Sequence, residues 1–427
     1  MNILLTTLGS GGDVYPFIAI GRELVRRGHA VKLMTNPHFA AAVSAGGLEF
    51  VGLGTEEEYL EAITHADLIH PSRGPTHVLQ HLVFGPAHEM YTAVRRVARQ
   101  MNADVLVRHH ICFGAGWAAE KENITDIPCT LAPVFWLNWR SPAVFGSLPF
   151  ALPRPLARFN LAIRTWGGRW VIDRPCNAIR RELSLPPQRD MFARNSRGDG
   201  VSLALWSPVL RGPLQGDPIG GIICGAAVHD ASDTANTALP AVLDAFVRTG
   251  APPVCFTLGT SVAHHAPEFY RHAAAALAAR KLRGIFVTGP GEASAAEQIA
   301  ATSGGTIFRA GYVPYSNLLH RCNAVVHHGG IGTIHACLKA GVPQLVVPFA
   351  NDEFDNAARI RRLGCGVGLR ASKLSDVTLV GMLAVVTSGL LHARAKQAGE
   401  KMATENGAAM AADCVERLAK GDRARHP

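Results

Sequence analysis

A glycine-rich turn with two histidines lies in the last third of the chain, where its neighbours would let it bind an anion. The turn, HHGGIGT, spans residues 327–333; it follows the apolar segment 324–326 and precedes residues 334–340, a predicted helix that stops at Gly341. A strand that leads through such a turn into a helix directs free N–H groups and the positive end of the helix dipole toward one point. Glycine lets the backbone approach a phosphate closely. The pattern predicts a diphosphate site, with an ordinary strand-loop-helix connection as the simpler alternative.

Acidic residues follow the next apolar segment, residues 344–348. They are Asp352, Glu353 and Asp355. Ligands of open α/β sheets bind outside the carboxyl ends of the strands, and carboxylates there can accept hydrogen bonds from sugar hydroxyls. Together with the glycine-rich turn, these residues indicate a site for a nucleotide-diphosphate sugar.

The elements that must position these residues follow an α/β pattern in both halves of the chain. At 427 residues the chain is too long for one ordinary core, so two domains are predicted. Residues 2–8 form an apolar run typical of a buried parallel strand; Pro16 could begin the following helix and Gly28 could end it. Further strands are predicted at 30–35, 103–109, 128–133, 253–259 and 284–288, with a helix at 268–281.

A segment rich in proline and glycine, residues 207–230, indicates a connection between the domains. The predicted organisation is an N-terminal domain over residues 1–215, a linker over 216–245, a C-terminal domain over 246–390 and a helical segment over 391–427.

Composition indicates a globular protein. Hydrophobic residues make up 48% and charged residues 18% of the chain, and no apolar stretch is long enough to cross a bilayer. The first residues begin a strand at once, so no secretory signal is predicted. The nine cysteines are scattered, and those in apolar runs, such as Cys255 and Cys337, are expected to be buried free thiols. These features favour a cytoplasmic location.

The net charge of +9 is concentrated in residues 154–194, which hold nine arginines against Asp173, Glu182 and Asp190. The cluster is either a solvated surface or a face for anionic lipid or an acidic acceptor. Nucleic-acid binding is not expected, because no recognisable nucleic-acid-binding module is present.

Apolar residues recur at helical spacing inside this arginine-rich region. They could line one face of a helix over residues 154–172, although Gly167 and Gly168 each weaken a helix by roughly 1 kcal/mol relative to alanine. Such a face either packs on the core or forms the wall of an apolar acceptor pocket that touches a membrane. The residues are Leu156, Phe159, Ile163, Trp166 and Trp170.

These motifs resemble the C-terminal signature of the family 1 (UDP-glycosyltransferase-like) glycosyltransferases, with residues 327–333 matching the HHGGxGT form of bacterial members. The resemblance covers nearly the whole chain, including the loop GSGGDVYP at 9–16, and is greatest to the rhamnosyltransferases of rhamnolipid synthesis, with sterol and macrolide glycosyltransferases further off. It implies an α/β fold of two facing Rossmann-like domains (GT-B) with a cleft between them. The first would bind the acceptor, the second the nucleotide sugar, and the C-terminal helical segment would pack back on the first.

The resemblance also implies residues for the donor diphosphate. His327 is the leading candidate, and His328 either takes part or only packs. The other diphosphate candidates are Gly329, Gly330, Gly332, Thr333, Thr260, Ser261 and Gly12.

Further roles follow from the same resemblance. Asp13 is expected to be the general base, although an aspartate before a helix is often an N-cap. Asp352 and Glu353 would bind the donor sugar, with Glu353 replacing the usual glutamine and so removing a hydrogen-bond donor. Tyr312 would stack on the nucleobase and Val313 would contact its edge through the backbone, unless the tyrosine only packs.

Aromatic and histidine side chains after strands of the first domain are candidates for the acceptor site. Their apolar character favours a lipophilic acceptor, and core packing is the alternative. The candidates are His109, His110, Phe135, Trp136 and Trp139.

We therefore expect an inverting glycosyltransferase that moves a hexosyl group from a UDP- or dTDP-linked sugar to a hydroxyl of a lipophilic acceptor, without cofactor or metal. Rhamnosyl transfer from dTDP-rhamnose to a hydroxy-fatty-acid lipid is an alternative, and a non-catalytic sugar-nucleotide-binding subunit is a remote one. An NAD-dependent dehydrogenase is disfavoured, because the GSGGD turn does not fit GxGxxG followed by an acidic residue. A cytoplasmic protein, with peripheral contact at the inner face of the membrane as an open alternative, is expected.

Overall fold

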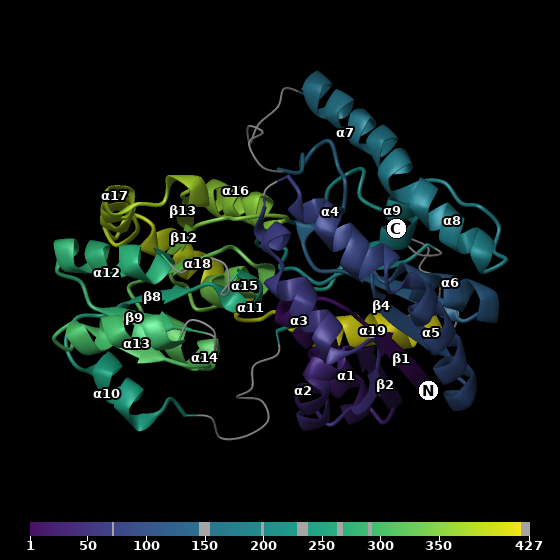
Figure 1. Ribbon diagram of the computed structural model, residues 1–427, viewed down its shortest axis with the longest axis horizontal. Helices are drawn as coiled ribbons and strands as arrows, with labels where there is room; N and C mark the ends of the chain where they lie inside the picture. The colour runs from purple at the N-terminus through teal and green to yellow at the C-terminus, as the bar shows by residue number, and fades with distance from the viewer. Residues whose placement is uncertain are drawn as a thin grey trace. The chain divides into compact units, whose positions relative to one another are not determined.

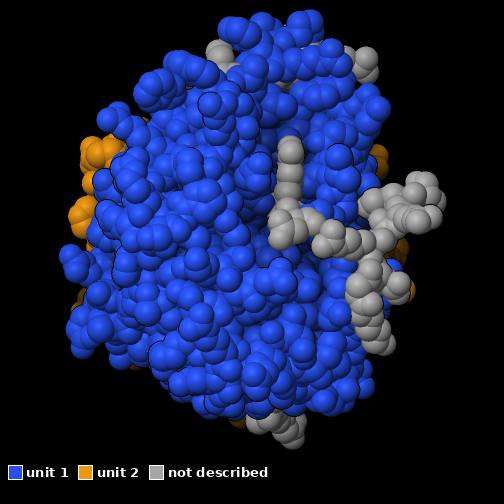
Figure 2. Space-filling view, turned by 90° about the vertical axis from the view of Figure 1, so that its right-hand side faces the viewer, with its two compact units in different colours: residues 1–63, 75–228, 406–427 blue, residues 64–74, 229–405 orange. Residues whose placement is uncertain are grey.

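Each half of the chain forms a parallel sheet covered by helices (Figure 1). The computed structural model describes residues 1–70, 72–144, 154–197, 200–228, 238–262, 268–288 and 293–419. The chain divides into two compact units, coloured separately in Figure 2. Unit 1 comprises Met1–Ile63, Pro75–Val228 and Asn406–Pro427, and unit 2 comprises Thr64–Gly74 and His229–Glu405.

Within the described residues, the sheet of unit 1 has seven parallel strands in the order β3-β2-β1-β4-β5-β6-β7. The chain moves outward from β1 to β3 and then restarts beside β1 with β4, which makes the β1/β4 edge a topological switch point. The strands are β1 (Asn2–Thr6), β2 (Ala30–Thr35), β3 (Glu49–Gly52), β4 (Val105–His109), β5 (Thr125–Thr130), β6 (Ser202–Ala204) and β7 (Gly221–Ile223).

Unit 2 repeats this arrangement. Its described residues form a six-stranded parallel sheet in the order β10-β9-β8-β11-β12-β13, with the switch point between β8 and β11. The strands are β8 (Val254–Thr257), β9 (Gly284–Val287), β10 (Ile307–Ala310), β11 (Ala324–His327), β12 (Gln344–Val346) and β13 (Gly366–Gly368). The predicted α/β class with two Rossmann-like domains is confirmed.

Helices on both sides of each sheet explain the unbroken apolar strands. In β8, Val254 and Phe256 enter one core cluster and Cys255 enters the other, so both faces of the strand are buried. All nine cysteines are buried and free, as expected for Cys255 and Cys337.

The helices of unit 1 are α1 (Gly11–Arg26), α2 (Ala40–Ala45), α3 (Glu56–Thr64), α4 (Gly74–Val78), α5 (Ala87–Met101), α6 (Phe113–Glu122), α7 (Arg154–Gly168), α8 (Arg174–Glu182), α9 (Met191–Arg197) and α19 (Gly407–Ala419). Those of unit 2 are α10 (Ala241–Arg248), α11 (Gly259–Val262), α12 (Glu268–Arg280), α13 (Ala293–Thr302), α14 (Tyr315–Leu318), α15 (Ile331–Lys339), α16 (Glu353–Leu363), α17 (Asp376–Val386) and α18 (His392–Met402).

The first helix starts earlier than predicted. It begins at Gly11 rather than at Pro16, because Ser10 and Asp13 form a capping box that satisfies the first turn, and Pro16 is accommodated inside the helix. Its end agrees with the prediction, since Arg27 is the C-cap and Gly28 has φ +87°.

Unit 1 extends further along the chain than residue 215. β7 pairs in parallel with β6 as the edge strand of the first sheet, and unit 1 continues to Val228. A three-residue strand between glycine-rich turns carries too little hydrophobic pattern to be predicted from sequence. The rest of the predicted linker includes residues 229–237, which lie outside the described residues.

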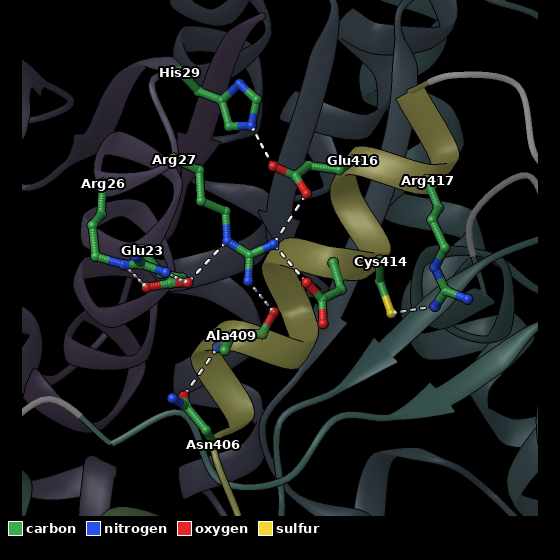
Figure 3. A network of polar contacts seen from close by, with 10 residues as sticks. Glu23, Arg26, Arg27, His29, Asn406, Ala409, Cys414, Glu416 and Arg417 are labelled. Atoms are coloured by element: carbon green, nitrogen blue, oxygen red, sulfur yellow. Dashed lines mark hydrogen bonds and ion pairs between the residues drawn. The ribbon is translucent and has the colours of Figure 1, made fainter.

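The C-terminal helical segment divides between the units. α18 packs on α15 in unit 2, whereas α19 packs on α1 in unit 1, and Asn406 accepts the N–H of Ala409 at the start of α19. Arg27, which follows α1, holds α19 through Asp413 at 2.5 Å and Glu416 at 3.0 Å (Figure 3). His29 adds a contact to the other carboxylate oxygen of Glu416 at 2.8 Å.

Candidate functional site

The glycine-rich turn lies at the switch point of unit 2. β8 and β11 are neighbours in the sheet, and their carboxyl ends lead into Gly259 and into His328, respectively. The two chain segments meet at the ring of His328, because a Cβ added to Gly259 would lie 2.6 Å from its Cε1 atom. Gly259 also has φ +65°, so glycine is required here for both its conformation and its lack of a side chain.

His327 points into the protein interior. Its side chain is fully buried, Nδ1 accepts the N–H of Gly329 at 3.2 Å, and Nε2 lies 3.0 Å from Oε1 of Gln344. These partners indicate a neutral ring protonated at Nε2, and burial lowers its pKa to about 4. The hypothesis that His327 binds the diphosphate therefore needs revision, because both ring nitrogens are engaged in holding the turn.

His328 is the histidine that borders the helix N-terminus. Its Nε2 would lie 2.5 Å from a Cβ placed on Gly330, the N-cap of α15, so the ring lies against the start of that helix. Nδ1 is buried and has no hydrogen-bond partner among the described residues. Burial, with a smaller effect of His327, lowers its pKa to about 3, so the ring is neutral at pH 7.

The N-terminus of α15 supplies backbone donors at the same place. The first N–H groups of a helix have no partner within the helix, and here they belong to Ile331, Gly332 and Thr333. Gly332 is exposed, and a Cβ on it would meet no atom within 4 Å, whereas Thr333 is buried. Gly329 has φ +108° and packs so closely on Val346 that a Cβ would lie 2.7 Å from that side chain.

The acidic residues after β12 differ in orientation. Asp352 is partly exposed, and burial of its carboxyl raises its pKa to about 6. Glu353 is 6% exposed, and its Oε2 accepts the N–H groups of Phe349 at 2.6 Å and Ala350 at 3.0 Å. Asp355 is fully buried and pairs with Arg359 at 2.6 Å. Asp352 is therefore the acidic side chain best placed to contact a ligand. The carboxylate of Glu353 is instead held by backbone N–H groups of the loop that precedes it.

Two residues missed by the sequence analysis connect this cluster. The fully buried Asn356 donates from Nδ2 to the carbonyl of Gly329 and to Oδ2 of Asp352, both at 2.9 Å. Gln344 orients His327 from the neighbouring strand. The four-residue spacing between Asp352 and Asn356, one helical turn, is the signal that could have revealed Asn356.

The remaining predicted residues of unit 2 lie at the same edge of the sheet. Tyr312 follows β10 and is 67% exposed, while the side chain of Val313 is buried in the core. Tyr315 joins their turn to β8 through a 2.9 Å hydrogen bond with Thr257. Thr260 and Ser261 lie in α11, and their side chains are outside the described part of the structure.

Asp13 lies at the switch point of unit 1, in the third position of α1. Its Oδ2 accepts the N–H of Ser10 at 2.7 Å and faces the Ser10 hydroxyl at 3.1 Å. A Cβ on Gly9, which has φ +125°, would lie 2.3 Å from this oxygen, so the carboxylate lies directly over the turn. Gly12 is in the same first turn of α1.

The predicted acceptor residues divide into interior and half-buried side chains. His109, at the end of β4, and His110 are buried, and burial lowers the pKa of both. Trp136 is 2% exposed and packs on Trp206 with ring centroids 4.9 Å apart, which makes it a core residue.

Phe135 and Trp139 are the half-buried members of this set. The ring of Phe135 lies 4.5 Å from that of His110, and Trp139 has the guanidinium groups of Arg140 and Arg158 over its ring at 4.6 and 4.4 Å. These two are the candidates that retain accessible surface.

Comparisons with known proteins find matches for both halves of the chain. Residues 3–100 match the family described as "Glycosyltransferase family 28 N-terminal domain", and residues 292–418 match "Erythromycin biosynthesis protein CIII-like, C-terminal domain". The chain is 29% identical over 450 residues to O-mycaminosyltylonolide 6-deoxyallosyltransferase of Streptomyces fradiae, with 100% of this chain and 99% of the relative covered.

Solved structures show the same fold. The glycosyltransferase of kitacinnamycin is similar at a TM-score of 0.72 and 21% identity, covering 98% of this chain and 99% of that one. The glycosyltransferase VinC, solved in complex with dTDP, is similar at a TM-score of 0.64 and 21% identity, covering 99% and 100%. The N-terminal domain match, the glycosyltransferase relative that covers the whole chain and the fold shared over its whole length together identify this protein as an enzyme, a glycosyltransferase of the GT-B type.

Proposed function

We propose that this enzyme is an inverting glycosyltransferase that moves a hexosyl group from a UDP- or dTDP-linked sugar to a hydroxyl of a lipophilic small molecule. The observation that carries the proposal is the position of His328, between Gly259 and the N-terminus of α15 at the switch point of unit 2. A neutral imidazole and the free N–H groups of a helix start can both donate to phosphate oxygens.

The leaving group in this reaction is a nucleoside diphosphate. As the bond between the anomeric carbon and the diphosphate breaks, negative charge grows on the phosphate oxygens. His328 and the N–H groups of Gly332 and Thr333 would stabilise that charge with preorganised hydrogen bonds. His327, Gln344 and Asn356 would act as positioning residues that hold the turn. Because these donors supply the stabilisation, we expect activity to survive chelation of divalent metal ions.

The acceptor hydroxyl attacks the anomeric carbon on the face opposite the leaving group and loses its proton. Asp13 is the residue we assign as general base, so that the proton moves from the acceptor oxygen to its carboxylate as the new glycosidic bond forms. One direct displacement inverts the configuration at the anomeric carbon. Asp352 would accept hydrogen bonds from donor-sugar hydroxyls, and Tyr312 would stack on the base.

The relatives support the choice of substrates. One acts, by its name, on a tylonolide and transfers a 6-deoxyallosyl group, and another was solved with dTDP. A hydroxylated, mainly apolar acceptor suits the half-buried Phe135 and Trp139 in unit 1. Donor identity separates the general proposal from its rhamnosyl alternative, in which dTDP-rhamnose and a hydroxy-fatty-acid lipid are the substrates.

The first experiment is calorimetric titration of the protein with UDP, dTDP and NAD. Binding of a pyrimidine diphosphate that is lost in His328→Ala supports the proposal and identifies the donor nucleotide. Binding of NAD with no response to either diphosphate would contradict it. Turnover of the matching nucleotide sugar with hydroxylated lipophilic acceptors then tests the proposed class of acceptor.

A further inference from the structure

Helix α7 and the π-helical turn η5 (Arg169–Asp173) present an apolar face that no described residue covers. Five large apolar side chains there are more than half exposed, and three of them are aromatic. Leu156, Phe159, Trp166 and Trp170 follow one another at spacings of three, seven and four residues, which places them on one face of the helix. The five side chains are Leu156 at 52%, Phe159 at 64%, Trp166 at 63%, Trp170 at 60% and Val171 at 54% exposed, and we refer to them as the α7 face.

The α7 face stands apart from the usual scatter of exposed apolar residues. A single exposed leucine or valine is normal on a protein surface, whereas contiguous exposed aromatic residues mark an interaction site. Trp166 and Trp170 contact each other, with ring centroids 6.5 Å apart. A Cβ on Gly167 or on Gly168 would meet no atom within 4 Å, so the helix is also open at these positions. In Figure 1, α7 continues through η5 into α8 as one long helical rod.

The chain segment that carries the α7 face is rich in positive charge. Residues 154–197 contain ten arginines against three carboxylates, so this one segment supplies most of the net charge of +9. Arg180 is buried against Glu120 and contributes nothing to the surface. The exposed arginines with described side chains are Arg158, Arg169, Arg174, Arg181, Arg189 and Arg194.

This combination fits a lipid surface better than a protein partner. Tryptophan side chains are favoured at the boundary between headgroups and acyl chains, since the indole has an apolar body and one polar N–H. Arginine has an apolar stem that can lie along such a boundary while its charge meets phosphate. An amphipathic helix with arginines beside an aromatic face binds in the plane of an anionic membrane surface.

We propose that the α7 face docks on the headgroup region of an anionic phospholipid bilayer. The apolar side chains enter the boundary with the acyl chains, and the flanking arginines contact lipid phosphates. Arg158 and Arg169 are the first among them, and Arg169 would exchange its 2.7 Å ion pair with Asp190 for a lipid phosphate. No helix in the described part of the chain is long and apolar enough to cross a membrane. The proposal rests on the proposed function only in that a bilayer would hold a lipophilic acceptor, and membrane binding is measured without either substrate.

The test is co-sedimentation of the purified enzyme with vesicles of phosphatidylcholine, with and without phosphatidylglycerol. We expect binding to the anionic vesicles to be at least about tenfold stronger than to the neutral ones and to weaken as salt is raised. The double variant W166S/W170S should lose about tenfold or more of this binding, because two indoles leave the boundary. R158Q/R169Q should reduce the preference for anionic vesicles while leaving the apolar side chains of the α7 face in place.

Ile219→Ser is the matched control, because Ile219 also belongs to unit 1 and is 88% exposed, yet lies outside the α7 face. It should bind vesicles like the wild type. Circular dichroism checks that each variant is folded, and binding of dTDP or UDP checks that unit 2 is intact. If W166S/W170S bound anionic vesicles as tightly as the wild type, or if the wild type bound none, the proposal would be overturned. A wild-type dimer that becomes a monomer in W166S/W170S, with no vesicle binding, would instead identify a second copy of the chain as the occupant.

Discussion

The imidazole rings of His327 and His328 stand at 86° to each other with centroids 6.4 Å apart, and they serve different parts of unit 2. His327 is bonded on both nitrogens to interior groups, whereas His328 lies against the glycines that begin α11 and precede α15. Two adjacent residues of one type thus divide into a structural role and a proposed ligand-binding role, since successive side chains leaving a strand point to opposite sides.

Alanine at each histidine should separate these roles. His328→Ala is expected to weaken binding of dTDP or UDP by about ten- to a hundredfold, the loss of one hydrogen bond to a charged group, with little change in stability. His327→Ala should cost about 2–4 kcal/mol of unfolding free energy, because the Gly329 N–H and the Gln344 side chain lose their buried partner. Calorimetric titration and urea unfolding measure the two quantities. Full diphosphate affinity in His328→Ala would return the ligand role to another residue.

Gly330→Ala should impair donor binding through His328. The new methyl group would lie 2.5 Å from Nε2, so the ring must move away from the N-terminus of α15. We expect the affinity for dTDP or UDP to fall about tenfold or more, since the loss of one charged hydrogen bond corresponds to at least that factor. Gly381→Ala is the control, because that helical glycine has open space around it and alanine favours a helix by roughly 1 kcal/mol. Unchanged nucleotide affinity in Gly330→Ala would show that the ring position is not critical.

Asp13→Asn should separate catalysis from binding. An asparagine oxygen can still accept the N–H of Ser10, so the start of α1 is preserved, but the side chain cannot take a proton. We expect kcat to fall about 10²–10⁴-fold with unchanged affinity for the nucleotide. Gly9→Ala should act in the same direction, because its Cβ would lie 2.3 Å from Oδ2 of Asp13. Retention of full turnover in Asp13→Asn would rule out its role as base.

Glu353 should make the stability of unit 2 depend on pH. Burial raises its pKa to about 8 from an ordinary value near 4.5, so the folded state binds more protons between these values than the unfolded state. Stability from this group is therefore fully present below about pH 4.5 and is lost as pH rises from there to about 8. We expect Glu353→Gln, which stays neutral and can accept the same two N–H groups, to change the Tm little at about pH 4 and to raise it relative to wild type by an amount that grows until about pH 8. The exposed Glu400→Gln should show no such difference, and a Tm gap independent of pH in Glu353→Gln would contradict the assignment.

Arg27 should be the key residue of the α1–α19 contact. It contacts Glu23, Asp413 and Glu416 and donates to the carbonyl of Ala409, with 18% of its side chain exposed. Arg27→Ala is expected to cost unit 1 about 1–3 kcal/mol of unfolding free energy, because several acceptors lose a partly buried charged partner. Arg26→Ala is the neighbouring control: its side chain is 71% exposed, and its pair with Glu23 should be worth less than about 1 kcal/mol. Equal losses in both variants would mean that the contact is only a surface charge effect.

The sequence predicted the fold well because both sheets are parallel and buried on two faces. Apolar runs such as residues 2–8 and 253–259, each followed by a helical pattern, correspond to β1 and β8. β7 was not predicted, because a strand of three residues is too short to show a hydrophobic pattern. The predicted start of α1 was too late in the chain, because Ser10 and Asp13 cap the helix before Pro16, the residue that suggested its beginning.

The candidate site was predicted as a region more accurately than as a set of side chains. The turn at 327–333 and the acids after β12 do meet at one sheet edge. Which side chain faces that edge depends on rotamers and interior partners that one sequence does not reveal. Thus His327 and Asp355 are held by Gln344 and Arg359, while His328 and Asp352 remain at the edge. The exposed α7 face could not be distinguished from a core-facing helix. Amphipathic spacing shows which side chains share one face of a helix, but it does not show whether that face meets the protein core or the solvent.

The position of α19 has a consequence for synthesis of the protein. Unit 1 begins at Met1, but its last helix comes after all of unit 2 in the chain. On the ribosome, the first sheet therefore emerges long before the helix that covers α1, and unit 2 can fold in the interval. Unit 1 is therefore completed only after unit 2 has been translated, so a chain truncated before α19 would lose stability in unit 1.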